Sequence, residues 1–361
     1  MKYIKGLDTL RAFAVIVVVL AHWWIPMDIN DSHKNFIFWY KGLIPDGGFG
    51  VDLFFVLSGF LITGILLDAV KNDGDQKWKI IKNFIVRRAL RIFPIYYLTI
   101  ALLVWIGFPF IKDHLFWFLL YISNIEVFRA GEWNAFSHTW SLSVEEQFYL
   151  IWPWFIIFVR EKYIKYVLFL SILIGVFTAV YVIKIEQKWM GYVLMPTCMQ
   201  AFGIGGLYAY LSKKGNLELF LKFIKIALPL ALFLHFHWSF SNEIGDNAYL
   251  DITLNSIISI WLIHLVLNNK SEWVRKYILE NSVLNKIGQV SYGIYLFHFV
   301  FGFVYEKAIT LMVSPSSETG LFLLDWKSNY FIRLTLLFAI SLGSFYLIEK
   351  PILKLKRFFE Y

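Results

Sequence analysis

Apolar runs about as long as a membrane-spanning helix recur along the whole chain, separated by short segments that hold most of the charged residues. An α-helix needs roughly 20 apolar residues to cross the hydrocarbon core of a bilayer. The runs predict ten transmembrane helices, at residues 9–27, 48–68, 84–108, 139–159, 164–184, 192–212, 219–237, 252–268, 284–306 and 328–349. The apolar stretch 114–122 is too short to cross and predicts a re-entrant or interfacial segment. We therefore expect an all-α fold, a polytopic membrane helical bundle.

Composition agrees with this fold class. Hydrophobic residues make up 58% of the 361 residues, charged residues make up 17%, and the mean hydropathy is +0.60. An ordinary soluble domain of this length is far more polar. No repeat of fixed period and no Pro- or Ser-rich linker divides the chain, so we expect a single integral membrane domain over residues 1–361.

The basic residues predict the orientation of the bundle. Most of the 34 Lys and Arg residues lie on one side of the membrane if the N-terminus is cytoplasmic, as the positive-inside rule requires. Both termini are then predicted to be cytoplasmic. The net charge of +8 follows from this topology and from contact with anionic lipid, so it does not indicate a nucleic-acid partner.

Several classes of chemistry lack support in the sequence. Cys198 is the single cysteine, which excludes disulfides within the chain and thiolate metal clusters. The glycine-rich motifs that bind dinucleotides and nucleoside triphosphates are absent, as are the zinc-protease and serine-hydrolase motifs. We therefore expect no metal.

Arg11 and His22 carry the strongest signal in the first apolar run. They are eleven residues apart, so on a helix they share one face and lie roughly 16 Å apart along its axis. Ionisable side chains inside a membrane are costly and usually functional. The alternative is that Arg11 extends to the interface and His22 caps the outer end of the helix.

Further polar residues form stripes within apolar runs. Asp52 lies near the outer end of the second run. It is either a functional carboxylate or a helix-entry carboxylate that the positive end of the helix dipole favours. The spacing of His138, Ser141, Glu145 and Tyr149 places them on one face of the fourth helix. In a membrane such a face must contact protein or water, because lipid cannot satisfy it.

A second stripe and a basic pair complete the candidates. Ser291, Tyr295 and His298 also share one helical face, although a buried histidine is often only a core residue. Arg88 and Arg91 lie three residues apart at the predicted inner end of the third run. Guanidinium groups bind phosphates through bidentate hydrogen bonds, so the pair could bind a phosphate. The alternative is that both arginines only anchor the helix at the cytoplasmic surface.

Depth in the membrane separates the candidates into two sets. His22, Asp52, Glu145 and His298 fall in the outer half of the predicted spans, whereas the arginines fall at the inner edge. The outer set could form a catalytic cluster reached from outside, and the arginines a phosphate-binding mouth open to the cytoplasm. A long phosphorylated donor would connect them.

At these residues the chain resembles the acyltransferase-3 family of integral membrane acyltransferases. The resemblance runs in the family's order through LDTLRAFAVIVVVLAH, GGFGVDLFFVLSGFLIT, RRALRIFPIYY, HTWSLSVEEQFYLIWP, VSYGIYLFH and YLIEKPILK. It implies transfer of an acyl group, most often acetyl from cytoplasmic acetyl-CoA, to a carbohydrate hydroxyl across the membrane. It also implies that His22 is the essential catalytic residue, that Arg11 is its partner in the Arg-x10-His motif, and that Arg88 and Arg91 lie near the donor. We expect no appended esterase-like domain.

The chemistry of these residues agrees with the resemblance. Moving an acyl group from a thioester to an alcohol needs a base or a nucleophile, and neutral imidazole serves as either. Arg11 is too far from His22 to orient it, so Asp52 or Glu145 is the better candidate for that role. We predict the following site: catalytic His22, Asp52, Glu145 and His298; donor-binding Arg11, Arg88 and Arg91; substrate-binding Ser141, Tyr149 and Tyr295.

The predicted function is that of a bacterial plasma-membrane O-acetyltransferase. Its acceptor would be an extracytoplasmic glycan such as lipopolysaccharide O-antigen, capsule or exopolysaccharide. A transporter or flippase for an acyl donor or lipid-linked sugar is the main alternative, because buried ionisable residues also serve proton relays. The aromatics Trp39, Tyr40 and Trp133 could stack on a sugar or anchor the chain at the interface. The acceptor, the acyl length and the oligomeric state stay open.

Overall fold

The structure is a computed structural model that describes residues 4–23, 45–134, 136–241 and 244–360. Of the residues that the structure describes, 87% are helical and none lies in a strand. Its long helices are α1 (Lys5–Trp23), α3 (Gly47–Asp73), α4 (Lys77–Trp105), α7 (Trp140–Phe158), α8 (Glu161–Ala179), α9 (Met195–Lys214), α10 (Leu217–Ser241), α11 (Ile244–Leu267), α14 (Ser291–Met312) and α16 (Trp326–Ser344). The predicted all-α membrane fold is confirmed.

Shorter elements connect these helices. They are η2 (Gly74–Gln76), α5 (Leu115–Leu119), α6 (Ser123–Ala130), η3 (Ser137–Thr139), η4 (Val180–Ile185), η5 (Trp189–Val193), α12 (Glu272–Val274), η6 (Arg275–Leu279), α13 (Ser282–Gln289), α15 (Glu318–Leu324), η7 (Phe345–Glu349), α17 (Lys350–Leu353) and η8 (Lys354–Phe358). The predicted interfacial stretch 114–122 forms the five-residue helix α5, which is far too short to cross a membrane.

Every predicted span overlaps one long helix. Seven segments in the described part are long and apolar enough to cross a membrane: Lys5–Trp23, Gly47–Asn72, Lys77–Trp105, Glu161–Ile185, Tyr249–Leu267, Ser291–Met312 and Tyr330–Phe358. The other three predicted spans correspond to α7, α9 and α10. We call the end of the bundle that holds Lys5 the inner end and the end that holds His22 the outer end, after the predicted orientation.

Two helix boundaries differ from the prediction. Helix α4 begins at Lys77 rather than at residue 84, so its arginines lie well inside the helix instead of at its inner end. The run 284–306 is divided at Val290 into α13 and α14. The side chain of Asn281 accepts hydrogen bonds from the backbone N–H groups of Val283 and Leu284, at 3.0 and 3.1 Å, and so starts α13 as a separate helix.

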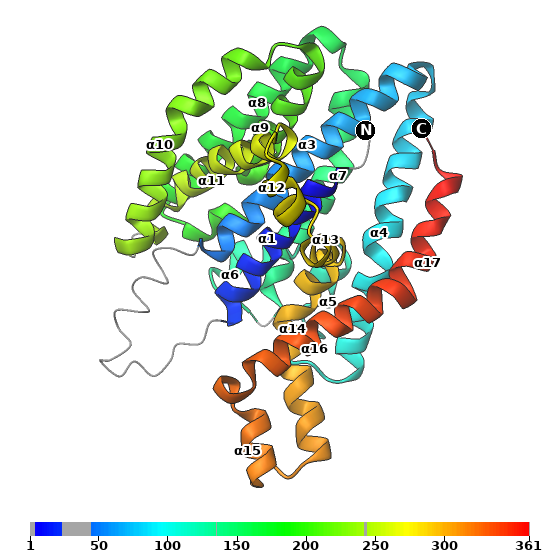
Figure 1. Cartoon of the computed structure of the whole chain (residues 1–361), viewed down its shortest axis with the longest axis vertical. Coiled ribbons are helices and arrows are strands. Elements are labelled where there is room, and N and C mark those ends of the chain that lie inside the picture. Colours follow the sequence, from blue (N-terminus) through cyan, green and yellow to red (C-terminus); the bar gives the residue numbers. More distant parts are fainter. Residues whose placement is uncertain (1–3, 24–44, 135, 242–243, 361) are drawn as a thin grey trace.

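Helices α1 and α3 run through the middle of the bundle, with α8 to α11 on one side and α4 with α17 on the other (Figure 1). The hairpin of α14, α15 and α16 extends beyond the remaining helices at the outer end (Figure 1). Helices α3 and α9 approach closely because glycines lie at their crossing: a Cβ on Gly59 would be 2.1 Å from the Phe202 carbonyl oxygen, and one on Gly205 equally close to that of Val56.

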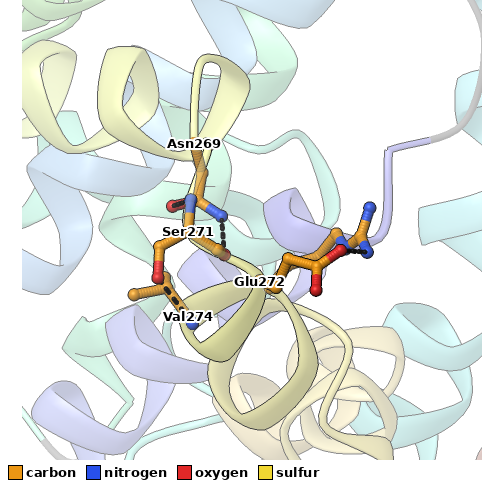
Figure 2. Close-up of polar contacts among 5 residues, drawn as sticks. Asn269, Ser271, Glu272 and Val274 are labelled. Carbon is orange, nitrogen blue, oxygen red and sulfur yellow. Dashed lines mark hydrogen bonds and ion pairs between the residues drawn. The ribbon is translucent and has the colours of Figure 1, made fainter.

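A tight turn returns the chain from α11 toward α1. Figure 2 shows that Asn269 donates to the Ser271 carbonyl oxygen at 2.8 Å, while the Ser271 hydroxyl accepts from the Val274 N–H at 3.3 Å. The π-helical turn η6 that follows receives hydrogen bonds from the Thr9 hydroxyl at its last two carbonyls. This anchorage fixes the inner half of α1, which carries Arg11.

Candidate active site

A cavity of about 90 Å³ lies where α1, α3, α4, α7 and α14 meet, and it opens to solvent. Its polar lining residues are Arg11, Ser58, Arg88, Arg91, Ser141, Glu145, Tyr149, Ser291, Tyr292 and Tyr295. On α3 the lining extends from Val51 to Ile62, a separation of eleven residues or roughly 16 Å along the helix. The cavity therefore runs along the bundle axis rather than across it.

Hydroxyl and carboxyl groups line the cavity toward its outer end. The Ser58 hydroxyl donates to the Glu145 carboxylate at 2.6 Å and lies 3.4 Å from the Tyr149 hydroxyl. The Ser141 and Tyr295 hydroxyls are 2.5 Å apart, and Tyr295 donates to the His138 carbonyl oxygen at 3.0 Å. These contacts join α3, α7 and α14, so the polar stripes predicted on separate helices face one space.

Three arginines line the same cavity from α1 and α4. Arg11 forms an ion pair with Asp8 at 2.6 Å, and the Arg88 guanidinium lies over the ring of Tyr149 at 5.3 Å. The neighbouring Arg87 instead donates to the carbonyl oxygens of Lys356 and Phe359 and holds the C-terminal segment. The arginine pair and Arg87 therefore have different surroundings although they are adjacent in sequence.

A cluster of three histidines lies just beyond the outer end of the cavity. Nε2 of His298 is 3.2 Å from Nδ1 of His22, and the His138 ring lies 5.1 Å from the His298 ring. His298 is fully buried, whereas His22 is exposed at the end of α1. Tyr295 connects the two regions, because it lines the cavity and its ring is 5.5 Å from that of His298.

Hydrogen-bond partners assign the protons in this cluster. Nδ1 of His298 lies 2.6 Å from the Tyr295 carbonyl oxygen, which can only accept, so this nitrogen carries the proton and Nε2 offers its lone pair. Nδ1 of His22 lies 2.9 Å from the Val18 carbonyl oxygen and must donate as well. We therefore assign a neutral His22 whose Nδ1–H is shared between Val18 and His298, leaving the Nε2 lone pair free.

Asp52 occupies a different place from the other predicted site residues. Its carboxylate accepts a hydrogen bond of 2.9 Å from the Asn255 side chain of α11, and both residues are buried. Glu145 bonds to Ser58. In the described part of the chain, the polar partners of His22 are thus a carbonyl oxygen and an imidazole rather than either carboxylate. His298, rather than Asp52 or Glu145, is therefore the residue whose side chain lies beside the His22 ring nitrogen.

Most of the predicted site residues share the cavity. It is lined by Arg11, Arg88, Arg91, Ser141, Glu145, Tyr149 and Tyr295, whereas His22 and His298 pair beyond it and Asp52 faces α11. Sequence reasoning missed Ser58, although a hydroxyl in a largely apolar helix was a usable signal. It also placed His138 on the stripe of α7, whereas this residue belongs to the turn η3 and its ring lies beside that of His298.

Comparisons with known proteins agree with the sequence pattern. A family model described as an acyltransferase domain, of the acyltransferase-3 type, matches residues 4–350. The chain is 30% identical to the peptidoglycan O-acetyltransferase OatA of Listeria monocytogenes, over 98% of this chain and 56% of OatA. It is 27% identical to a Staphylococcus aureus protein named "Putative O-acetyltransferase", over 94% of this chain and 62% of that protein. The chain thus spans about three fifths of the relatives it matches. No solved structure matches it.

Proposed function

The chain belongs to the acyltransferase-3 family, and we propose that it transfers an acetyl group from cytoplasmic acetyl-CoA to a hydroxyl of an extracytoplasmic glycan. One observation carries this proposal. A single cavity along the bundle axis joins three arginines to a polar lining, and Tyr295 connects that lining to the His22–His298 pair. This arrangement suits a long donor that has phosphates at one end and a reactive thioester at the other.

The arginines are proposed to bind the phosphates of the donor. Arg11, Arg88 and Arg91 supply guanidinium groups to one mouth, and such groups match phosphate geometry. The cavity extends roughly 16 Å from this region, enough for an extended arm that presents its thioester near Ser141 and Tyr295. Ser141, Tyr149 and Tyr295 would then hydrogen-bond the arm and the carbonyl oxygen of the acyl group.

His22 is the proposed catalytic residue. Its free Nε2 lone pair takes the proton of the acceptor hydroxyl, whose oxygen attacks the thioester carbonyl carbon as the C–S bond breaks and the departing thiolate takes the proton. Alternatively, Nε2 attacks the thioester carbonyl carbon and expels the coenzyme A thiolate; the acceptor oxygen then attacks the acyl carbon, its proton passes to that thiolate, and the imidazole leaves. Both routes require a neutral imidazole with Nδ1–H held, which Val18 and His298 provide.

The remaining polar residues are proposed to act through others. His298 positions His22 by accepting from Nδ1–H. Glu145 holds the Ser58 hydroxyl on the cavity wall, and Asp52 holds Asn255 and so fixes the outer parts of α3 and α11. His298, Glu145 and Asp52 are therefore proposed as positioning residues, in place of the catalytic roles predicted from the sequence.

The enzyme is proposed to reside in a bacterial plasma membrane with both termini cytoplasmic. Lipopolysaccharide O-antigen, capsule and exopolysaccharide are acceptors of the required chemistry. Peptidoglycan is a further candidate, because OatA, which matches nearly the whole of this chain, is named as a peptidoglycan O-acetyltransferase. All of these offer sugar hydroxyls on the side of the membrane toward which His22 is exposed.

Purified protein with acetyl-CoA and a soluble glycan tests the proposal. We expect release of coenzyme A and acetylated glycan, and a loss of at least ~10²-fold in His22→Asn and His22→Gln, because neither amide can act as a base. His22→Asn retains a donor close to Nδ1, so it should fold as the parent does. His237→Ala, at an exposed histidine of α10, is the matched control. Near-parent activity in a well-expressed His22→Asn protein would refute the assignment, and glycan movement without coenzyme A release would instead indicate a transporter.

A further inference from the structure

Three aromatic rings gather at the outer end of the bundle, beyond the ends of the long helices. The Trp133 ring centroid is 6.4 Å from that of Trp189 and 6.0 Å from that of Tyr192. The remaining pair, Trp189 and Tyr192, is 6.3 Å apart. Both tryptophans are 46% exposed, although burial is the usual state of so large an apolar side chain. We call Trp133, Trp189 and Tyr192 the aromatic platform.

The segment that carries Trp133 is held by a fixed set of hydrogen bonds. The Asn134 side chain donates to the buried Glu126 carboxylate at 2.9 Å, and the Asn134 backbone N–H donates to the Ser137 hydroxyl at 2.5 Å. Burial raises the pKa of Glu126, and His114 and Asn134 oppose that rise. Two hydrogen bonds therefore hold Asn134, the residue next to Trp133, which lowers the cost of ordering the Trp133 side chain when a ligand binds.

The platform adjoins the histidine cluster. The Tyr192 ring is 5.6 Å from the ring of Trp140, the first residue of α7. Two residues earlier, His138 belongs to the turn η3, and its ring is 5.1 Å from that of His298. A ligand on the platform would thus lie at the same end of the bundle as His22, connected to it through Trp140, His138 and His298.

Anchoring at the membrane interface is the ordinary role of exposed tryptophans in such proteins. Trp78 and Trp154 fit that role, because they project from the sides of α4 and α7 near the inner end, with ring centroids 5.5 Å apart. The platform differs in position, since its rings come from the segment after α6 and from η5. It also differs in its neighbours in sequence, which include the exposed polar residues Glu132, Gln187 and Lys188.

We propose that the aromatic platform binds a sugar unit of the glycan acceptor, an inference that rests on the proposed function. A pyranose ring has an apolar C–H face and a polar rim of hydroxyls. Exposed indole rings match the face, and neighbouring polar side chains match the rim. The platform holds a sugar unit apart from the one presented to His22, so it recognises a chain of sugars rather than a single sugar.

The test combines equilibrium binding with turnover in the full-length protein. Soluble oligosaccharides of glucose, of N-acetylglucosamine and of rhamnose are titrated calorimetrically into the parent and into Trp133→Ala, Trp189→Ala and Trp133→Phe. Coenzyme A release without acceptor is measured on the same samples as a check on folding and donor chemistry. Trp105→Ala is the matched control, because Trp105 is 81% exposed at the outer end of α4.

We expect at least one oligosaccharide to bind the parent, and each alanine variant to bind it at least ~10-fold more weakly, since aromatic anchors dominate such contacts. Trp133→Phe and Trp105→Ala should remain near the parent, and acceptor-free coenzyme A release should not change. Parent-like affinity in both alanine variants, or a parent that binds none of the sugars, would overturn the platform. Glycan binding that depends on the platform, without any acetyl-CoA turnover, would instead overturn the proposed function and support glycan binding by the platform.

Discussion

Neutralising Arg88 and Arg91 together should weaken donor binding through the loss of phosphate contacts. Both residues line the cavity with Arg11, well inside α4, so they are placed to contact a ligand rather than only the membrane surface. Hydrogen bonds to charged groups contribute about 1.5–3 kcal/mol each, so losing one from each arginine removes roughly 3–6 kcal/mol. At about 1.4 kcal/mol per tenfold, the Arg88→Gln/Arg91→Gln variant should bind acetyl-CoA roughly 10²–10⁴-fold more weakly.

The assay is equilibrium binding of two donors that differ in phosphate. Acetyl-CoA should show the full loss, whereas S-acetylpantetheine, which has no phosphate, should bind the variant and the parent alike. Lysine at both positions should rescue poorly, because an ammonium group keeps the charge without the planar fork. Arg275→Gln is the matched control, since Arg275 pairs with Glu272 on an exposed segment away from the cavity.

Two results would contradict this reasoning. Unchanged acetyl-CoA affinity in the double glutamine variant would mean that the arginines only anchor α4 at the predicted inner surface. An equal loss for acetyl-CoA and S-acetylpantetheine would mean that the substitutions disturb the cavity itself. The second result has a structural basis, because Arg88 lies over the rings of Phe84 and Tyr149 and packs as well as carrying charge.

Two further predictions concern the histidine pair and the sidedness of the reaction. His298→Leu removes one acceptor of His22 Nδ1–H and should lower kcat up to ~10-fold, with little change in the KM of either substrate. His298→Gln should recover most of the rate. A change in KM alone, or no recovery by glutamine, would contradict the positioning role. In sealed proteoliposomes of known orientation, acetyl-CoA should act only from the face that bears the termini, and acetylated glycan should appear in the opposite compartment. Activity with both substrates confined to the cytoplasmic face would contradict transfer across the membrane.

Much of the fold could be predicted from run length alone. Because lipid cannot hydrogen-bond the backbone, each apolar run of sufficient length must become a helix, and each predicted span overlaps one. Boundaries were less predictable, since polar residues extend some helices beyond the predicted span, as Lys77 does for α4. The start of α13 depends on capping by Asn281, and its position depends on packing against α1; hydropathy reports neither.

The site was predictable as far as helical periodicity reaches. Ser141, Glu145 and Tyr149 share one face of α7, and the structure directs that face into the cavity. Periodicity within one helix does not specify which other helix that face meets. Asp52 and Ser58 lie on the same helix, six residues apart, yet one bonds to α11 and the other lines the cavity with Glu145. The pairing of His22 with His298 joins residues 276 positions apart, a contact that only tertiary structure specifies.

The different exposures of the two paired histidines agree with the roles proposed for them. A base for an incoming hydroxyl has to be reachable, and His22 is exposed at the end of α1. An exposed imidazole can rotate and exchange tautomers, so its lone pair would not stay on Nε2. His298 is fully buried, fixed by the Tyr295 carbonyl oxygen on Nδ1, and further held by the Trp23 indole N–H, which donates to its carbonyl oxygen at 2.8 Å. In the proposed mechanism, the rigid buried imidazole of His298 therefore holds the proton of His22 on Nδ1, and Nε2 of His22 stays free to meet the acceptor.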